Sequence, residues 1–123
     1  SYIQLGRVDE GIVALKRAVA LDDKNGAVRS LLGEALFQQA GGKVTPEALA
    51  VFQEALKRDA KDPRARFYVG LGLMQAGKDR EALDAWVAII RDGPPDAEWL
   101  PAIRAAAREL AVKLKLDPKL AVP

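Results

Sequence analysis

The chain has 123 residues, 50% of them apolar and 29% charged, which suits a single domain with its own core and excludes a multidomain enzyme. It contains no cysteine and no histidine, so it lacks the thiol and imidazole groups on which most catalytic, metal-binding and haem-ligating sites depend. Nineteen basic and seventeen acidic residues, mixed along the chain, give a net charge of +2, which does not indicate nucleic-acid binding.

Every predicted element is a helix, because apolar residues recur at three- and four-residue spacing and no alternating strand pattern is present. In chain order we expect a short remnant at residues 1–6 and then helices at residues 8–22, 26–40, 46–60, 63–76, 79–92 and 96–115. No apolar stretch approaches the roughly 20 residues of a membrane helix. Because the chain opens at Ser1 without Met or a leader, we expect a soluble piece of a longer protein, with no membrane contact of its own.

Turn residues mark the predicted boundaries between these helices. Residues 41–46 read Gly-Gly-Lys-Val-Thr-Pro, where a glycine can close one helix and Thr45-Pro46 supplies an N-cap and a first helical residue for the next. Prolines break the helical pattern at residues 59–63 and 92–96, because proline cannot continue the preceding helix. These signals divide the chain into helix pairs.

Two residue series repeat along the chain. Small, bulky, small-or-apolar and turn residues follow one another at the same offsets in three places: Gly11, Leu15, Ala18, Asp23; Ala48, Phe52, Ala55, Ala60; and Ala82, Trp86, Ile89, Pro94. Leu32-Gly33 and Val69-Gly70 recur 37 residues apart. Such periods are typical of stacked helix repeats. We therefore predict an all-α solenoid of antiparallel helix pairs, with a truncated repeat at 1–25, repeats at 26–62 and 63–96, a C-terminal capping helix at 97–116 and a tail at 117–123.

The small residues of both series are predicted packing positions rather than binding residues. A larger side chain at such a position would force two helix axes apart. The residues concerned are Gly33, Gly70, Ala48 and Ala82, and the bulky side chains predicted to lie opposite them are Phe52 and Trp86. A structural role explains all of them.

The two series resemble the tetratricopeptide repeat (TPR) family, which has a Leu-Gly pair on the first helix of each repeat and a small–bulky–small–turn series on the second. The matching residues are Leu32-Gly33, Val69-Gly70, Ala48, Phe52, Ala55, Ala82, Trp86 and Pro94, and Tyr2 fits the aromatic residue that ends a first helix. Ala60 and Asp23 stand where the family usually has proline. The resemblance covers about residues 2–95 and implies a TPR-type solenoid.

A narrower resemblance runs through nearly the whole chain. The segments GGKVTPEA at 41–48, DPRARFYVGL at 62–71 and DAEWL at 96–100 are similar to the periplasmic repeat domain of the CcmI/CycH family of cytochrome c maturation factors. The resemblance implies a non-catalytic, chaperone-like domain, located in the periplasm of a Gram-negative bacterium and anchored to the inner membrane in the full-length protein. It would bind the C-terminal helical segment of apocytochrome c and present it to subunits of the haem ligation complex, without a cofactor of its own.

In stacked helix pairs the first helices line the concave side, so a peptide ligand is expected on the helices at 26–40 and 63–76 and on the capping helix. Helical spacing puts nine groove residues there: Ser30, Glu34, Phe37, Gln38, Arg64, Phe67, Leu71, Met74 and Gln75. The apolar members predict a stripe for an amphipathic helix, with polar side chains to fix its register and a methionine that adapts to unequal ligands. Alternatively, Phe37, Leu71 and Met74 simply pack between helices.

The chemistry of these positions excludes some kinds of ligand. Repeat domains that hold a C-terminal carboxylate use converging Lys, Arg and Asn side chains, whereas the comparable places here hold Glu34, Phe67 and Leu71. Glu34 would favour basic residues on a ligand, or is a solvated carboxylate at the rim. Direct haem ligation is disfavoured, since Met74 alone is a weak ligand. The absence of thiols suits a protein that holds reduced cysteines in an oxidising compartment.

Two other functions stay open at this point: a structural adaptor for haem lyase subunits, and a generic TPR co-chaperone. An enzyme is not expected, because Asp, Glu and Lys show no catalytic spacing and fit solvated helix faces. The basic segment from Trp99 to Lys119 is interpreted as a polar capping face, or alternatively as a docking face. Apolar residues Tyr2, Ile3 and Leu5 predict self-association through the N-terminal end.

Overall fold

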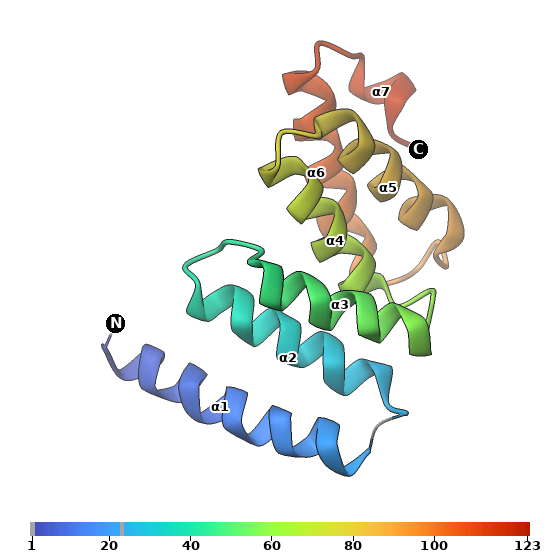
Figure 1. Cartoon of the computed structure of the whole chain (residues 1–123). Helices are drawn as coiled ribbons and strands as arrows, with labels where there is room; N and C mark the ends of the chain where they lie inside the picture. Colours follow the sequence, from blue (N-terminus) through green and yellow to red (C-terminus); the bar gives the residue numbers. More distant parts are fainter. Residues whose placement is uncertain (1, 23) are drawn as a thin grey trace.

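The structure, a computed structural model, describes the backbone of residues 2–22 and 24–123, and the side chains of residues 7–22 and 24–123. Over these residues it is all-helical (Figure 1). Its helices are α1 (Tyr2–Leu21), α2 (Gly26–Gln39), α3 (Pro46–Arg58), α4 (Pro63–Gln75), α5 (Asp79–Asp92), α6 (Leu100–Lys113) and α7 (Pro118–Ala121). The predicted all-α class is confirmed.

The helices stack in chain order, so that each one packs mainly on its neighbours in sequence (Figure 1). The pairs α2–α3 and α4–α5 have the most extensive contacts. Helix α1 packs on α2 at one end of the stack, and α6 packs on α5 at the other, with α7 against α6. This is the architecture expected of stacked helix pairs, in which each pair completes its core by contact with the next.

The chain between α2 and α3 shows how local sequence sets the helix ends. Gly41 and Gly42 adopt φ values of 70° and 92°, a backbone conformation that glycine adopts at little cost. Thr45 then caps α3, because its Oγ1 accepts a hydrogen bond of 3.2 Å from the backbone N–H of Ala48. Pro46 occupies the first turn, where its missing N–H is least costly. The predicted helix stop and start are both confirmed.

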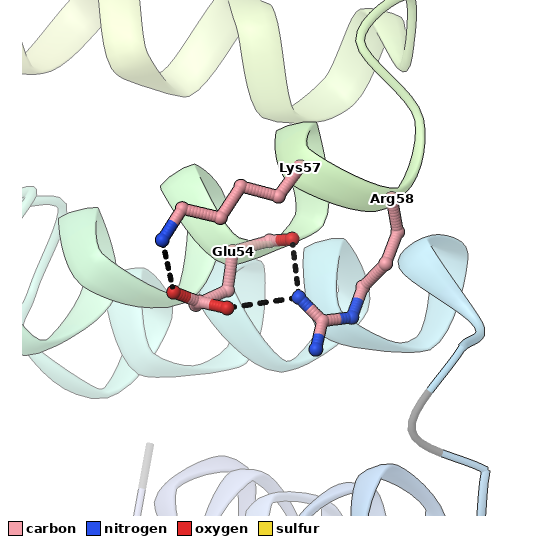
Figure 2. A network of polar contacts seen from close by, with 3 residues as sticks. All are labelled: Glu54, Lys57 and Arg58. Carbon is pink, nitrogen blue, oxygen red and sulfur yellow. Dashed lines mark hydrogen bonds and ion pairs between the residues drawn. The ribbon is translucent and has the colours of Figure 1, made fainter.

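The C-terminal end of α3 carries a polar network (Figure 2). Lys57 Nζ donates to Glu54 Oε1 at 2.9 Å, and Arg58 Nη1 donates to Glu54 Oε2 at 2.8 Å and to the Glu54 carbonyl at 3.1 Å. The hydrogen bonds from Lys57 and Arg58 hold the pKa of Glu54 below its ordinary value. Both cations also lie where the helix dipole favours positive charge.

Glycine positions set the close approach within each complete pair. A Cβ at Gly33 would lie 2.6 Å from Cε1 of Phe52, and a Cβ at Gly70 would overlap the indole of Trp86. Phe52 and Trp86 are 0% and 2% exposed, so neither ring has room to move away. The predicted pairing is therefore confirmed for Gly33 with Phe52 and for Gly70 with Trp86. Ala48 and Ala82 are buried as predicted, but they lie on the same helices as the two rings and not opposite them.

Three predicted segments differ from the structure. Residues 1–6 and 8–22 were expected as separate helices, but α1 is continuous from residue 2 to 21, because a glycine such as Gly6 costs only about 1 kcal/mol inside a helix and does not force a turn. The expected helix at 96–115 is shorter at both ends: α6 starts at Leu100 and ends at Lys113, and Lys115 adopts a left-handed φ of 62°. The expected tail contains the short helix α7, capped by Asp117.

The predicted self-association through Tyr2, Ile3 and Leu5 concerns side chains outside the described residues.

Candidate functional site

An open pocket of about 300 Å³ lies between the N-terminal part of α4, the middle of α2 and the start of α6. Three elements that are distant in sequence therefore meet around it. The walls are mainly apolar and are lined by Glu34, Asp62, Pro63, Arg64, Phe67, Tyr68, Trp99, Ala102 and Ile103. A concave apolar surface with a few polar groups at its edge is the usual form of a binding site.

Aromatic contacts fix the pocket wall that α4 provides. The ring of Phe67 stacks on Trp86 with a centroid separation of 5.2 Å, and it meets Tyr68 edge-on at 5.4 Å. Tyr68 in turn stacks on Phe52 at 4.9 Å and packs at a tilt against Phe37 at 4.8 Å. Because Phe52 and Trp86 are buried core residues, the pocket wall is continuous with the cores of both repeats.

The indole of Trp86 also determines where Phe67 lies. Its Nε1–H donates a hydrogen bond of 3.0 Å to the backbone carbonyl of Phe67, although both residues already contact each other through their rings. A buried tryptophan needs such a partner for its N–H group. One core side chain of α5 therefore holds both the backbone and the side chain of a pocket residue on α4.

A small polar group forms one edge of the pocket. Glu34 Oε2 accepts a hydrogen bond of 3.3 Å from the hydroxyl of Tyr68 and pairs with Arg64 Nε at 3.2 Å. Burial of Tyr68, together with the negative charge of Glu34, raises the pKa of the Tyr68 phenol to about 12. The Glu34 carboxylate thus has two partners within the chain, and its predicted preference for basic residues of a ligand stays a prediction.

Three of the nine residues predicted for the groove line this pocket: Glu34, Arg64 and Phe67. Phe37 lies beside it, against the ring of Tyr68. Leu71 and Met74 are half-buried and pack on the apolar core formed by α5 and α6, further along α4. Each of these side chains packs between helices and keeps an exposed part, and its contact with a ligand stays a prediction.

The prediction for Ser30 is wrong. Its side chain is fully buried and its hydroxyl donates to the carbonyl of Ala27 at 3.0 Å, so it cannot contact a ligand. Ser30 follows Gly26 and precedes Gly33 on the stripe of small, buried residues along α2. Both glycines contact α3, at Ala55 and Phe52 respectively, which places Ser30 on the face that packs on α3. Ser30 was thus assigned to the wrong face of α2, whereas Glu34, from the same predicted face, does line the pocket.

The two glutamines of the predicted groove lie away from the pocket. Gln38 is exposed near the end of α2. Gln75, at the end of α4, accepts a hydrogen bond of 2.8 Å from the N–H of Val44 and donates one of 2.8 Å to the carbonyl of Gly42. Gln75 therefore fastens the connection between α2 and α3 to the following repeat.

Sequence reasoning missed six lining residues: Asp62, Pro63, Tyr68, Trp99, Ala102 and Ile103. Asp62 and Pro63 start α4, where the Asp62 carboxylate accepts a hydrogen bond of 3.1 Å from the N–H of Arg64. Ala102 and Ile103 come from α6, and Trp99 directly precedes it. The predicted capping helix was expected to face a ligand, but none of its residues was named as a groove residue. Tyr68 could have been predicted from sequence, because it is adjacent to the aromatic Phe67 on a helix that was expected to contact the ligand.

Among the described residues, no group of three or more histidine, cysteine, aspartate or glutamate side chains could hold a metal ion. No described helix has the length and apolar character needed to cross a membrane. The pocket itself has mainly apolar walls and one polar edge, where Glu34 and Arg64 lie.

Comparison with known proteins gives relatives for most of the chain, although no protein-family model matches it. It is 43% identical over 110 residues to the cytochrome c-type biogenesis protein CycH of Rhizobium meliloti (strain 1021), covering 89% of this chain. It is 35% identical over 103 residues to CycH of Bradyrhizobium diazoefficiens, covering 84% of this chain. It spans only 29% and 28%, respectively, of the length of these relatives.

A solved structure resembles the whole stack. The type III secretion translocator chaperone SycD of Yersinia enterocolitica superposes with a TM-score of 0.71 over 93% of this chain and 79% of its own, at 20% sequence identity. This likeness concerns the fold, which is TPR-like. Over most of its length the chain is therefore homologous to one part of the CycH cytochrome c-type biogenesis proteins, and it folds as a TPR-like helical solenoid.

Proposed function

We propose that this chain is a non-catalytic binding domain of cytochrome c maturation, and that the pocket between α2, α4 and α6 receives the C-terminal helix of apocytochrome c. The name of its curated relatives supports the pathway. Its fold supports a binding role, since stacked helix repeats present concave surfaces to partners.

The observation that carries the proposal is the apolar pocket itself. Phe67 lines it from α4, Ile103 from α6, and Trp99 from the position directly before α6. An amphipathic helix places its large apolar side chains on one face, at positions three and four residues apart. We infer that one bulky apolar side chain of the ligand enters the pocket, while neighbouring side chains lie against the exposed parts of Phe37 and Leu71.

The polar edge fixes the register of the ligand helix in the pocket, and it does not select ligands by their net charge. Arg64 and Glu34 are about 41% and 31% exposed at their side chains, and they neutralise each other across 3.2 Å. Such a pair can offer a donor and an acceptor to polar groups of a bound helix without attracting a particular net charge. The remaining selectivity then comes from the shape of the apolar pocket.

The proposed cellular setting is the periplasm of a Gram-negative bacterium, in a protein anchored to the inner membrane. There the domain would present the bound apocytochrome c to subunits of the haem ligation complex. The absence of cysteine suits this task, because a holder without thiols cannot form mixed disulfides with the reduced cysteines of its client.

Calorimetric titration with a peptide from the C-terminal helix of the same organism's cytochrome c tests the proposal. We expect saturable binding that a scrambled peptide does not reproduce. Phe67→Ala should weaken binding by about tenfold or more, as is typical of a central apolar contact, without loss of helical content. Val112→Ala, a change of an exposed apolar residue on α6 outside the pocket, is the matched control and should bind as the unchanged chain does.

Two outcomes would contradict the proposal. Equal binding of the natural and scrambled peptides would show that the domain does not recognise the sequence of the ligand. An equal loss of affinity with Phe67→Ala and Val112→Ala would show that the pocket is not the binding site. If haem ligation subunits are retained by the domain while no cytochrome peptide binds, the structural adaptor becomes the better interpretation.

A further inference from the structure

The side chain of Trp99 lies between the pocket and a second, smaller cavity of about 140 Å³. The smaller cavity is beside the connection from α5 to α6, and its lining includes Ile89, Asp92, Gly93 and Pro94. Among the described residues, Trp99 alone lines both cavities. The position of this one ring therefore affects the shape of both.

The backbone does not require a glycine at position 93. Gly93 is the C-cap of α5, with φ −79° and ψ 156°, an extended conformation that alanine also adopts and that is usual before a proline such as Pro94. Its N–H donates a hydrogen bond of 3.0 Å to the carbonyl of Ile89, which alanine would keep. The requirement for glycine therefore lies in the space around the residue.

The six-membered ring of Trp99 occupies the space that a side chain at position 93 would need. A Cβ built on Gly93 would overlap Cη2 of Trp99, and it would lie 3.2 Å from Cζ2 of the same ring and 3.2 Å from the carbonyl oxygen of Ile89. The backbone is held at this point, because Gly93 bonds to Ile89 and the adjacent Asp92 pairs with Arg66 of α4 at 3.0 Å. Relief of the overlap therefore requires the Trp99 ring to move away from Gly93.

We propose that Gly93 is a positioning residue for the ligand pocket: it leaves room for the ring of Trp99, and the seated ring then sets the width of the pocket. Because Trp99 lies between the two cavities, a ring that moves away from Gly93 enters the pocket. The wall on α4 cannot retreat to compensate, since Phe67 is stacked on the buried Trp86 and bonded to it.

This assignment rests on the proposed function of the pocket, and it adds a residue that does not itself line the pocket. A bulky apolar side chain of the ligand helix can enter only while the Trp99 ring stays in the space beside Gly93. A side chain at position 93 would thus narrow the site without removing any of the groups that touch the ligand.

Gly93→Ala tests the assignment with two readouts. In NMR spectra without ligand, nuclear Overhauser contacts between the rings of Trp99 and Phe67 should strengthen, because the Trp99 ring moves into the pocket. In calorimetric titration, the C-terminal cytochrome c peptide should bind about fivefold or more weakly, since its central apolar contact is obstructed. Gly11→Ala is the matched control, because no described atom lies within 4 Å of its added Cβ, and it should change neither readout.

Trp99→Phe provides a second background for the same substitution. Phenylalanine has no counterpart of the Cη2 and Cζ2 atoms that meet position 93. Adding Gly93→Ala to Trp99→Phe should therefore leave peptide affinity within about twofold of that of Trp99→Phe alone, as expected when one substitution acts through the other residue. A merely structural contact would instead lower the unfolding free energy of Gly93→Ala and leave the affinity of the folded chain unchanged.

The outcomes separate this assignment from the proposed function. Unchanged contacts of the Trp99 ring in Gly93→Ala overturn the assignment, as does a loss of helical content, because the ring would then have no room to enter the pocket. An affinity that stays unchanged although the ring has moved, or that falls equally in both backgrounds, overturns it as well. If the peptide binds none of the chains, the proposed function fails, and the position of the Trp99 ring alone decides the role of Gly93.

Discussion

Glycine has opposite roles at two positions of the same repeat pattern. Gly33 faces Phe52, where a Cβ would lie 2.6 Å from the ring, whereas Gly11 is inside α1 with open space around it. Gly33→Ala should therefore destabilise the chain by about 1–3 kcal/mol through overpacking. Gly11→Ala should instead stabilise it by about 0.5–1 kcal/mol, because alanine favours helix more than glycine does.

Urea unfolding of the two glycine variants measures both effects in one experiment. The comparison controls for helix propensity, since each substitution is the same change in a helix interior. Destabilisation of similar size in both variants would show that the contact of Gly33 with Phe52 is not what distinguishes them.

The phenol of Tyr68 predicts a pH dependence of stability at alkaline pH. Its pKa rises from 10.0 to about 12 in the folded chain, through burial and the nearby Glu34 carboxylate. Between pH 10 and pH 12 the unfolded chain releases this proton while the folded chain keeps it. The free energy of unfolding should therefore fall as pH rises through this range, and the contribution is fully present only below pH 10.

Tyr68→Phe isolates this effect, because phenylalanine keeps the ring contacts and cannot ionise. We expect the difference in unfolding free energy between the original chain and the variant to change across the same pH range. Parallel pH curves for the two proteins would mean that the Tyr68 phenol ionises equally in the folded and unfolded chains.

At the scale of single helices, the ends of a helix could be predicted from sequence more reliably than the face that it buries. Thr45, Pro46 and the preceding glycines act through local backbone chemistry, so their sequence was sufficient to place the boundary between α2 and α3. The face on which Ser30 lies could not be fixed in the same way, because a serine is small enough to pack against another helix and polar enough to face solvent. Ser30 consequently went to the wrong face, and only its packing against α3 corrects it.

The connection between α2 and α3 gives a prediction about an element that has no regular structure. Gln75 holds it through Val44 N–H and the Gly42 carbonyl, each at 2.8 Å. Gln75→Ala should accelerate hydrogen exchange of the Val44 amide, while global stability changes by no more than about 1 kcal/mol. Gln38→Ala, at an exposed position of α2, serves as control. An unchanged exchange rate of the Val44 amide in the Gln75 variant would show that Gln75 does not hold this connection.

At the scale of the whole molecule, the repeat series predicted the fold but only part of the site. The pairing of Gly33 with Phe52, and of Gly70 with Trp86, reflects steric requirements within one helix pair, so it could be predicted from the repeating residue types. The pocket depends instead on how α6 approaches α4, and Trp99 reaches it from an element with no repeat signature. The sequence indicated that the capping helix faces a ligand, but the particular residues Trp99 and Ile103 depend on tertiary packing and could not be named from sequence.

The cores of the two complete helix pairs are linked by aromatic contacts. Phe52 stacks on Tyr68, Tyr68 meets Phe67 edge-on, and Phe67 stacks on Trp86. These contacts join the two pairs into one packed unit behind the pocket.

Amide and indole shift mapping with the cytochrome c peptide examines ligand binding at the pocket directly. On saturation, the largest shifts should fall on residues around Glu34, on the start of α4 and on the side-chain N–H of Trp99. The Trp86 side-chain N–H, which is buried and bonded to the Phe67 carbonyl, should move less. Shifts confined to α5 and α7, or a Trp99 signal that does not respond to the peptide, would contradict binding between α2, α4 and α6.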